Sequence, residues 1–242
     1  MRDYKKETDN RVRYIQEKLK ESHTKGIILG NSGGKDSALV LILCKLACDN
    51  TIGVIMPCNS KRNYGEDLDD ALALAKQFNI ETRTVDLSET KKVLQGAIGK
   101  ATDISPLADT NINPRLRMTT LYTIAQSENL LVAGTSNRSE IYMGYFTKWG
   151  DGGCDLNPIA DLTATEVIEY LKYFNAPENI INKAPSAGLY DGQTDEKDMG
   201  VTYAAIDEYI TTGKASDRDK EIIDRYHSRS EHKRRLPSMY SE

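Results

Sequence analysis

A short glycine-rich turn, set between an apolar run and an apolar helix, constrains this chain more than any other feature of its sequence. Residues 26–30 read GIILG, and the turn NSGGKDS follows at residues 31–37. The stretch from Ser37 to Cys48 is apolar on nearly all sides, as in a helix packed between two layers. A strand, a tight turn and a buried helix in this order are typical of one unit of a parallel α/β sheet.

The same alternation continues along the chain. Apolar runs predict further strands at 51–56, 82–87 and 130–133, and helical spacing predicts helices at 67–78 and 114–128. The first twenty residues form an amphipathic pattern, and Thr163 and Glu166 have capping-box spacing at the start of another helix. The polar stretch 99–113 is predicted to be a loop. We therefore expect one α/β domain over residues 1–242, with a doubly wound, mostly parallel sheet and a mostly helical C-terminal part.

Charge and composition narrow the possible partners. Lys and Arg number 32 against 36 Asp and Glu, a net charge of −4, which argues against a protein that wraps nucleic acid. The four cysteines show no CxxC pair, so we expect reduced thiols. The charged N-terminus and the lack of a membrane-length apolar run predict a cytoplasmic protein without a membrane span.

The glycine-rich turn has the context of an anion site. Backbone N–H groups at a helix start favour phosphate, and Gly33 and Gly34 allow close approach. A Walker A loop would need Ser or Thr after the lysine, but Asp36 follows Lys35. A carboxylate beside phosphates calls for a cation, so Asp36 is a candidate magnesium ligand; the plainer alternative is a tight turn with no ligand. The expected ATP-binding residues here are Gly30, Asn31, Ser32, Gly33, Gly34, Lys35, Asp36 and Ser37.

The segment SGGKDS at 32–37 resembles the pyrophosphate loop of the N-type ATP pyrophosphatases. That resemblance implies cleavage of ATP to AMP and pyrophosphate, which activates an oxygen for a nitrogen or sulfur nucleophile. The loop alone does not separate NAD synthetases from GMP synthetases, asparagine synthetases or tRNA-thiolating enzymes.

Later segments resemble the NAD synthetase family, in the family's order. They are NPRLRM (113–118), AGTSNRSE (133–140), GYFTKWGDGG (144–153), APSAGLY (184–190), GQTDE (192–196) and EHKRRLP (231–237). The resemblance implies an adenine nucleotide alpha-hydrolase-like, Rossmann-like fold. It also implies a homodimeric ligase that amidates nicotinic acid adenine dinucleotide (deamido-NAD) through an acyl-adenylate, with ATP as co-substrate.

The family's residue roles carry over to matching positions. Asp36 and Glu140 would hold Mg²⁺, although Glu140 could instead be an ordinary helix-surface carboxylate. Thr135 and Ser186 would contact ATP. The residues implied for deamido-NAD are Arg115, Lys148, Asp155, His232 and Lys233, and Lys148 and Asp155 join the two metal ligands as implied catalytic residues.

One departure bears on competence. Ala164 stands where the family usually has a lysine that reaches ATP phosphate. One positive charge is therefore missing near the triphosphate, unless Lys183 or Lys35 supplies it. This departure favours the alternative of a non-catalytic adenine-nucleotide sensor of the same fold. Another N-type ATP pyrophosphatase is a separate alternative. We expect no glutaminase domain, and hence free ammonia as the nitrogen source.

Overall fold

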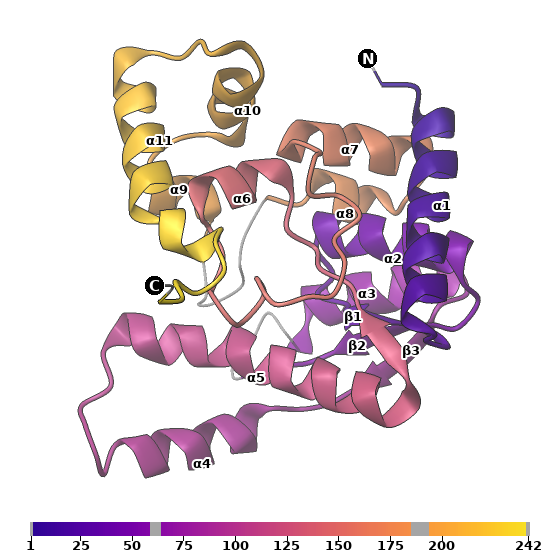
Figure 1. Ribbon diagram of the computed structural model, residues 1–242, viewed down its shortest axis with the longest axis horizontal. Coiled ribbons are helices and arrows are strands. Elements are labelled where there is room, and N and C mark those ends of the chain that lie inside the picture. The colour runs from indigo at the N-terminus through magenta and orange to yellow at the C-terminus, as the bar shows by residue number, and fades with distance from the viewer. Residues whose placement is uncertain (1, 59–63, 185–193, 241–242) are drawn as a thin grey trace.

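Four parallel strands form the centre of the protein. The computed structural model describes residues 2–58, 64–184 and 194–240. Within these ranges the sheet order is β3-β2-β1-β4 (Figure 1). The strands are β1 (Gly26–Gly30), β2 (Thr51–Ile55), β3 (Glu81–Thr84) and β4 (Leu130–Val132). The chain moves outward from β1 to β3 and then returns to place β4 on the other side of β1.

Helices cover both faces of the sheet. Successive side chains of β1 point to opposite faces, and those on each face are apolar and pack against helices. Ile27 and Leu29 pack in one apolar cluster, whereas Ile28 packs in another. The first face carries α1 (Tyr4–Ser22), α2 (Lys35–Ala47), α3 (Glu66–Gln77), α7 (Ala164–Tyr173) and α8 (Glu178–Asn182). The second carries α5 (Pro106–Glu128), against which α4 (Ser88–Ile98) packs. The predicted doubly wound α/β fold is confirmed.

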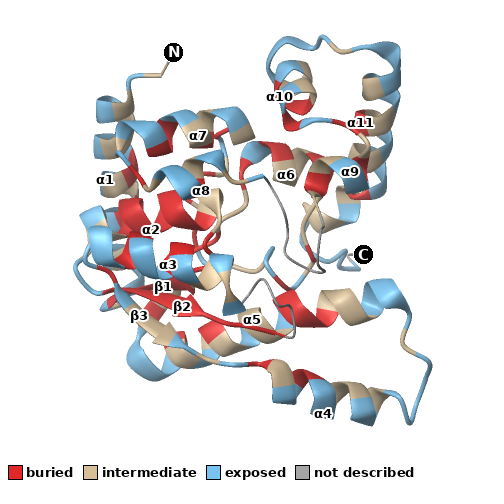
Figure 2. Ribbon diagram, turned by 180° about the vertical axis from the view of Figure 1, so that it is seen from behind, coloured by how far each residue is buried: buried red, intermediate tan, exposed pale blue. Residues whose placement is uncertain are grey.

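A smaller helical group stands beside the sheet and has its own core. It comprises α6 (Arg138–Met143), α9 (Asp195–Met199), α10 (Tyr203–Thr212), α11 (Asp217–Arg229) and the 3₁₀ turn Glu231–Lys233. Met143, Ile206 and Ile223 are fully buried within it, and the burial colours of Figure 2 show this inner face. The predicted helical C-terminal part is therefore confirmed, and it brings distant segments to one end of the sheet (Figure 1).

The predicted loop at 99–113 is wrong from Pro106 onward. Helix α5 starts there, with the Ser105 hydroxyl accepting a hydrogen bond from the Ala108 amide. Pro106 suits the first helical turn, where its missing N–H would be unsatisfied in any case. Pro114, which suggested a helix start, lies inside the helix and is buried.

The third strand is shorter than predicted and ends at Thr84. The following segment still runs along β2, since the Val85 and Leu87 amides donate to the carbonyls of Ile55 and Pro57. The capping box predicted at Thr163 and Glu166 is present at the start of α7. All four cysteines are free thiols. No helix among the described residues combines the length and apolar character that crossing a bilayer requires.

Candidate functional site

A cavity of about 1150 Å³ opens at the carboxyl ends of β1 and β4. These neighbouring strands lead in opposite directions around the sheet, and such switch points are where α/β sheets bind ligands. The glycine-rich loop after β1 and residues 134–137 after β4 both line this cavity. Of the predicted ATP-binding residues, Thr135 and all of 30–37 except Gly33 lie on its wall.

Gly33 has a different task. Its φ is +70°, and a Cβ at this position would lie 2.3 Å from the Asp67 carbonyl oxygen. Glycine is therefore required for the turn itself, which packs against the start of α3. The Ser32 hydroxyl accepts from the Gly34 amide at 3.2 Å and lies 2.9 Å from the Ser37 hydroxyl, which stiffens the loop.

The start of α2 is open toward the cavity. Gly34 is its N-cap residue, and no side chain from the described part of the protein caps it. The first turn of the helix, with the positive end of the helix dipole, therefore lies at the wall that Lys35, Asp36 and Ser37 form. This arrangement favours an anionic group such as a phosphate.

Two carboxylates meet beside this helix start, joined by an asparagine that the sequence analysis did not single out. The Asn137 side-chain amide donates to Asp36 Oδ1 at 2.9 Å, and the Asn137 backbone amide donates to Glu140 Oε2 at 3.1 Å. Asn137 also forms the capping box of α6 with Glu140. The Asn137–Glu140 spacing was the one signal in the sequence that could have identified this residue.

Both carboxylates are held in an environment that disfavours their charge. Each side chain is half-buried and opens into the cavity, with protein on its other sides. Burial raises the pKa of Asp36 to about 6. Burial, followed by the negative charge of Asp36, raises the pKa of Glu140 well above its ordinary value. Within the described ranges, neither carboxylate forms an ion pair that would offset this cost.

Further acidity comes from a residue that the sequence analysis missed. Asp195 is buried at the start of α9 and lines the cavity. It accepts a hydrogen bond from the Tyr203 hydroxyl at 3.2 Å, and its charge adds to the pKa rise of both Asp36 and Glu140. No local pattern marks Asp195, because only the packing of the helical group beside the sheet brings it here.

This donor set fits a hard divalent cation whose other ligands are waters and phosphate oxygens. Asp36 and Glu140 offer carboxylate oxygens, and a positive ion would offset their mutual repulsion. The described residues include no group of three or more acidic, histidine or cysteine side chains placed to hold a metal. A sparse protein set of this kind suits Mg²⁺, which keeps several waters and shares phosphate oxygens.

Ala164 lies on the cavity wall at the first turn of α7, so the slot that usually holds a lysine does face the site. Lys183 also lines the cavity, but its ammonium already pairs with Asp67 at 2.7 Å and Asp70 at 2.6 Å. Lys35 makes no ion pair within the described ranges, and burial lowers its pKa. Lys35 is therefore better placed than Lys183 to supply the missing positive charge.

Of the residues implied for deamido-NAD, one lines the cavity and three lie outside it, next to the cavity rim. Lys233 lines the cavity and donates to the carbonyls of Gly144 and Phe146 at 2.8 and 2.7 Å. Arg115, Lys148 and His232 do not line it but contact one another in series. Arg115 donates to the Lys148 carbonyl at 3.4 Å, and the Lys148 ammonium donates to the His232 carbonyl at 2.7 Å.

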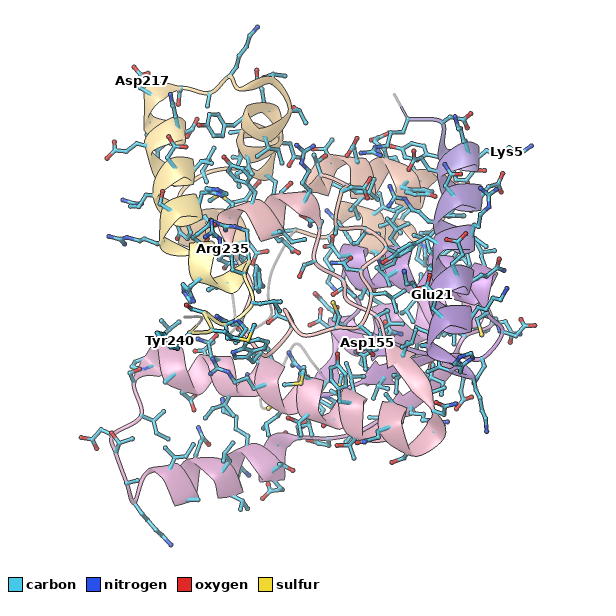
Figure 3. The ribbon with its side chains drawn as sticks, viewed as in Figure 1. Lys5, Glu21, Asp155, Asp217, Arg235 and Tyr240 are labelled. Atoms are coloured by element: carbon cyan, nitrogen blue, oxygen red, sulfur yellow. The ribbon has the colours of Figure 1, made fainter. Side chains whose placement is uncertain are left out.

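Asp155 lies apart from both groups, beside α5 and β4 (Figure 3). Its carboxylate accepts hydrogen bonds from the Tyr122 hydroxyl at 3.0 Å and from the Val132 amide at 2.8 Å. The structure thus gives Asp155 a role in joining the helix to the strand, and its implied catalytic role stays a prediction. Ser186, expected to contact ATP, lies outside the described residues.

Beside the glycine-rich loop, part of the cavity wall is apolar. It is lined by side chains at the carboxyl end of β2 and on the helices beside it: Val54, Ile55, Met56, Pro57, Leu68 and Leu121. A helix start that favours phosphate and an apolar wall beside it together suit a molecule that carries both phosphates and a flat ring.

Comparison with known proteins gives a consistent result. A family described as NAD synthase matches residues 7–242. The chain is 47% identical over 240 residues to an NH(3)-dependent NAD(+) synthetase from Carboxydothermus hydrogenoformans, covering 98% of both chains. Among solved structures, NMN synthetase from Francisella tularensis matches with a TM-score of 0.94 and 36% identity over the whole of both chains. NH3-dependent NAD synthetase from Campylobacter jejuni matches with a TM-score of 0.79 and 31% identity, also over the whole of both.

Proposed function

Since the chain belongs to the NAD synthase family, we propose that it uses ATP and ammonia to amidate nicotinic acid adenine dinucleotide, giving NAD, AMP and pyrophosphate. The observation that supports this most directly is the pairing of Asp36 and Glu140, through Asn137, at the open start of α2. Such a site places phosphates beside a position for a divalent cation. The apolar wall beside the glycine-rich loop would take the adenine ring of ATP.

The reaction divides into two balanced steps. A nicotinate carboxylate oxygen attacks the α-phosphorus of ATP, the bond from that phosphorus to the bridging oxygen breaks, and pyrophosphate leaves. Ammonia then attacks the acyl carbon, AMP leaves with the carboxylate oxygen, and one proton is released. No covalent bond to the protein is required, so the side chains act by positioning and by electrostatics.

Particular residues would perform the positioning. The first-turn amides of α2 and Lys35 would hold the triphosphate, and Lys233 would orient the anionic substrate on the cavity side of the rim. Asp36 and Glu140 would hold Mg²⁺, which supplies positive charge to the departing pyrophosphate. We propose a homodimer as the assembled form, because the outer residues Arg115 and Lys148 lie on a surface that one chain leaves open.

The relatives named as NH(3)-dependent support free ammonia as the nitrogen source. The test is a turnover assay with ATP, Mg²⁺, ammonium and the dinucleotide, in which AMP and NAD are followed together. We expect equal amounts of both products and at most trace product when glutamine replaces ammonium. ATP binding without AMP or NAD would contradict the proposal and favour the non-catalytic sensor.

A second candidate substrate is nicotinic acid mononucleotide, which lacks the adenylate half of the dinucleotide. The higher TM-score with NMN synthetase, 0.94 against 0.79, favours it, while the curated relatives favour the dinucleotide. The ratio of kcat/KM values for the two substrates in the same assay decides between them. We expect the dinucleotide to have the larger value.

The missing lysine at position 164 leads to a separate prediction. Replacing Lys35 by Met should raise the KM for ATP by about 10- to 100-fold, since charge-assisted contacts contribute roughly 1.5–3 kcal/mol. Adding Ala164→Lys to that variant should recover part of the loss, because position 164 also faces the cavity. Lys5→Met, on the exposed outer side of α1 (Figure 3), is the matched control and should change nothing. An unchanged KM in Lys35→Met would show that Lys35 does not contact ATP.

A further inference from the structure

The turn at residues 147–153 forms one wall of the cavity and has two unlike sides. Thr147, Gly150 and Asp151 line the cavity, whereas Lys148 and Trp149 between them do not. The turn is anchored to the protein, because the Thr147 hydroxyl donates to Asn111 on α5 at 2.7 Å and the Thr147 amide donates to Asp151 at 2.9 Å. The side chains of Lys148 and Trp149 are therefore held on the outside of a fixed wall.

Trp149 is in an unfavourable state on two counts. Its φ is +61°, in the left-handed region that bulky residues rarely adopt, so the backbone is strained here. The residue is 53% exposed, so its side chain gains little from burial. The Lys148 ammonium lies over the ring, 5.3 Å from its centroid. A strained and exposed aromatic residue on an anchored turn is more readily explained by a ligand than by folding.

The charges around this ring are positive and lack acidic partners. Arg115 and Lys148 donate to the backbone carbonyls of Lys148 and His232, and within the described ranges neither forms an ion pair. Asp151 is on the other side of the turn, where it accepts from the Thr147 amide. The outer face thus offers two cations and a flat ring, a combination that suits a phosphate joined to a heteroaromatic base.

We propose that Trp149 is the stacking platform for the adenine ring of the dinucleotide substrate, and that it selects the dinucleotide over the mononucleotide. This inference rests on the proposed amidation of a nicotinic acid nucleotide. The nicotinate end lies inside the cavity with Lys233, and the pyrophosphate crosses the rim at Lys148 and Arg115. The adenine then reaches the outer face, which a mononucleotide is too short to reach.

The single tryptophan makes binding directly measurable without turnover. Intrinsic fluorescence should be quenched by nicotinic acid adenine dinucleotide, and neither nicotinic acid mononucleotide nor ATP should reproduce the effect. In the turnover assay, Trp149→Gly should raise the KM for the dinucleotide about tenfold with little change in kcat. The KM for the mononucleotide should not change, and Trp149→Phe should retain most of the dinucleotide affinity.

The choice of glycine guards against a folding artefact, since glycine adopts a φ of +61° without strain. Trp149→Gly should therefore melt at or above the temperature of the unaltered protein. Quenching by the mononucleotide to the same extent, or an unchanged KM for the dinucleotide in an active enzyme, would overturn the inference while leaving the amidation intact. An indole already shielded from acrylamide by a second copy of the chain, with no response to the dinucleotide, would also overturn it. If the dinucleotide quenches the fluorescence of the unaltered protein but no product forms, the result would count against the amidation alone.

Discussion

Replacing Asp36 by Asn is expected to reduce kcat by at least about 10²- to 10³-fold and, at the same time, to make the ligand-free protein more stable. The activity falls because the amide removes one of the two negative charges available to a divalent cation, and losing one electrostatic stabiliser at a reacting centre has an effect of this order. The stability rises because Asn keeps the shape and can still accept from Asn137, while an unfavourable charge is removed.

The sign of the stability change follows from the raised pKa. Burial raises the pKa of Asp36 from 3.8 to about 6 in the folded protein, so its charge makes folding progressively less favourable between these pH values and has its full effect above pH 6. Two pKa units correspond to about 3 kcal/mol as an upper bound, and contact with cavity water reduces this, so we expect about 1–2 kcal/mol at pH 8. Calorimetric melting in EDTA measures it, and Mg²⁺ with ATP should stabilise the unaltered protein more than Asp36→Asn.

Asp103→Asn is the matched control, because it removes the same charge from an exposed site. It should leave both activity and melting temperature within error. An Asp36→Asn protein that melts below the unaltered protein would mean that the carboxylate stabilises the fold. The loss of activity would then follow from the loss of stability, and the metal assignment would lose its main support.

The sequence could place Asp36 and Glu140 near one another because both follow adjacent parallel strands. This inference needs only the rule that the carboxyl ends of parallel strands lie at one edge of the sheet. Asn137 could also have been found, since it begins a capping box. These residues are connected by local rules of strand, turn and helix start.

The remaining site residues depend on packing that no local rule describes. Asp195 reaches the cavity only because the apolar faces of α6, α10 and α11 join in a separate core. Helix α5 shows the opposite difficulty: Pro114 suggested a beginning, whereas Ser105 and Pro106 marked the actual one. Lys183 carried no signal for a role in stability, because its two acidic partners lie on α3, more than a hundred residues earlier.

Replacing Lys183 by Met is expected to have the largest effect on stability. Its ammonium pairs with Asp67 and Asp70 and donates to the Gly33 carbonyl at 3.2 Å, so it joins α8, α3 and the phosphate loop. The three side chains are only 12%, 12% and 9% exposed. Removing one partner of a buried ion pair typically costs about 3–5 kcal/mol, because the remaining charge is uncompensated.

For a chain of this length, that loss should lower the melting temperature by roughly 10 °C or more. Urea unfolding of Lys183→Met against the unaltered protein measures it directly. Adding Asp70→Asn should recover part of the loss, since it removes one of the two carboxylate charges that Lys183 neutralises. Lys172→Met is the matched control: its ammonium pairs with Glu169 at 2.8 Å, but the two side chains are 54% and 46% exposed. An exposed pair of this kind contributes about 0–1 kcal/mol.

The double variant also separates a structural role for Lys183 from direct contact with ATP. If Lys183 only neutralises Asp67 and Asp70, Asp70→Asn should restore both the unfolding free energy and part of the ATP affinity, because the loop regains its support. If stability recovers while the KM for ATP remains raised, Lys183 reaches the phosphates itself. A Lys183→Met protein as stable as the unaltered one would show that water solvates both carboxylates, and the buried ion-pair account of this loop would then be wrong.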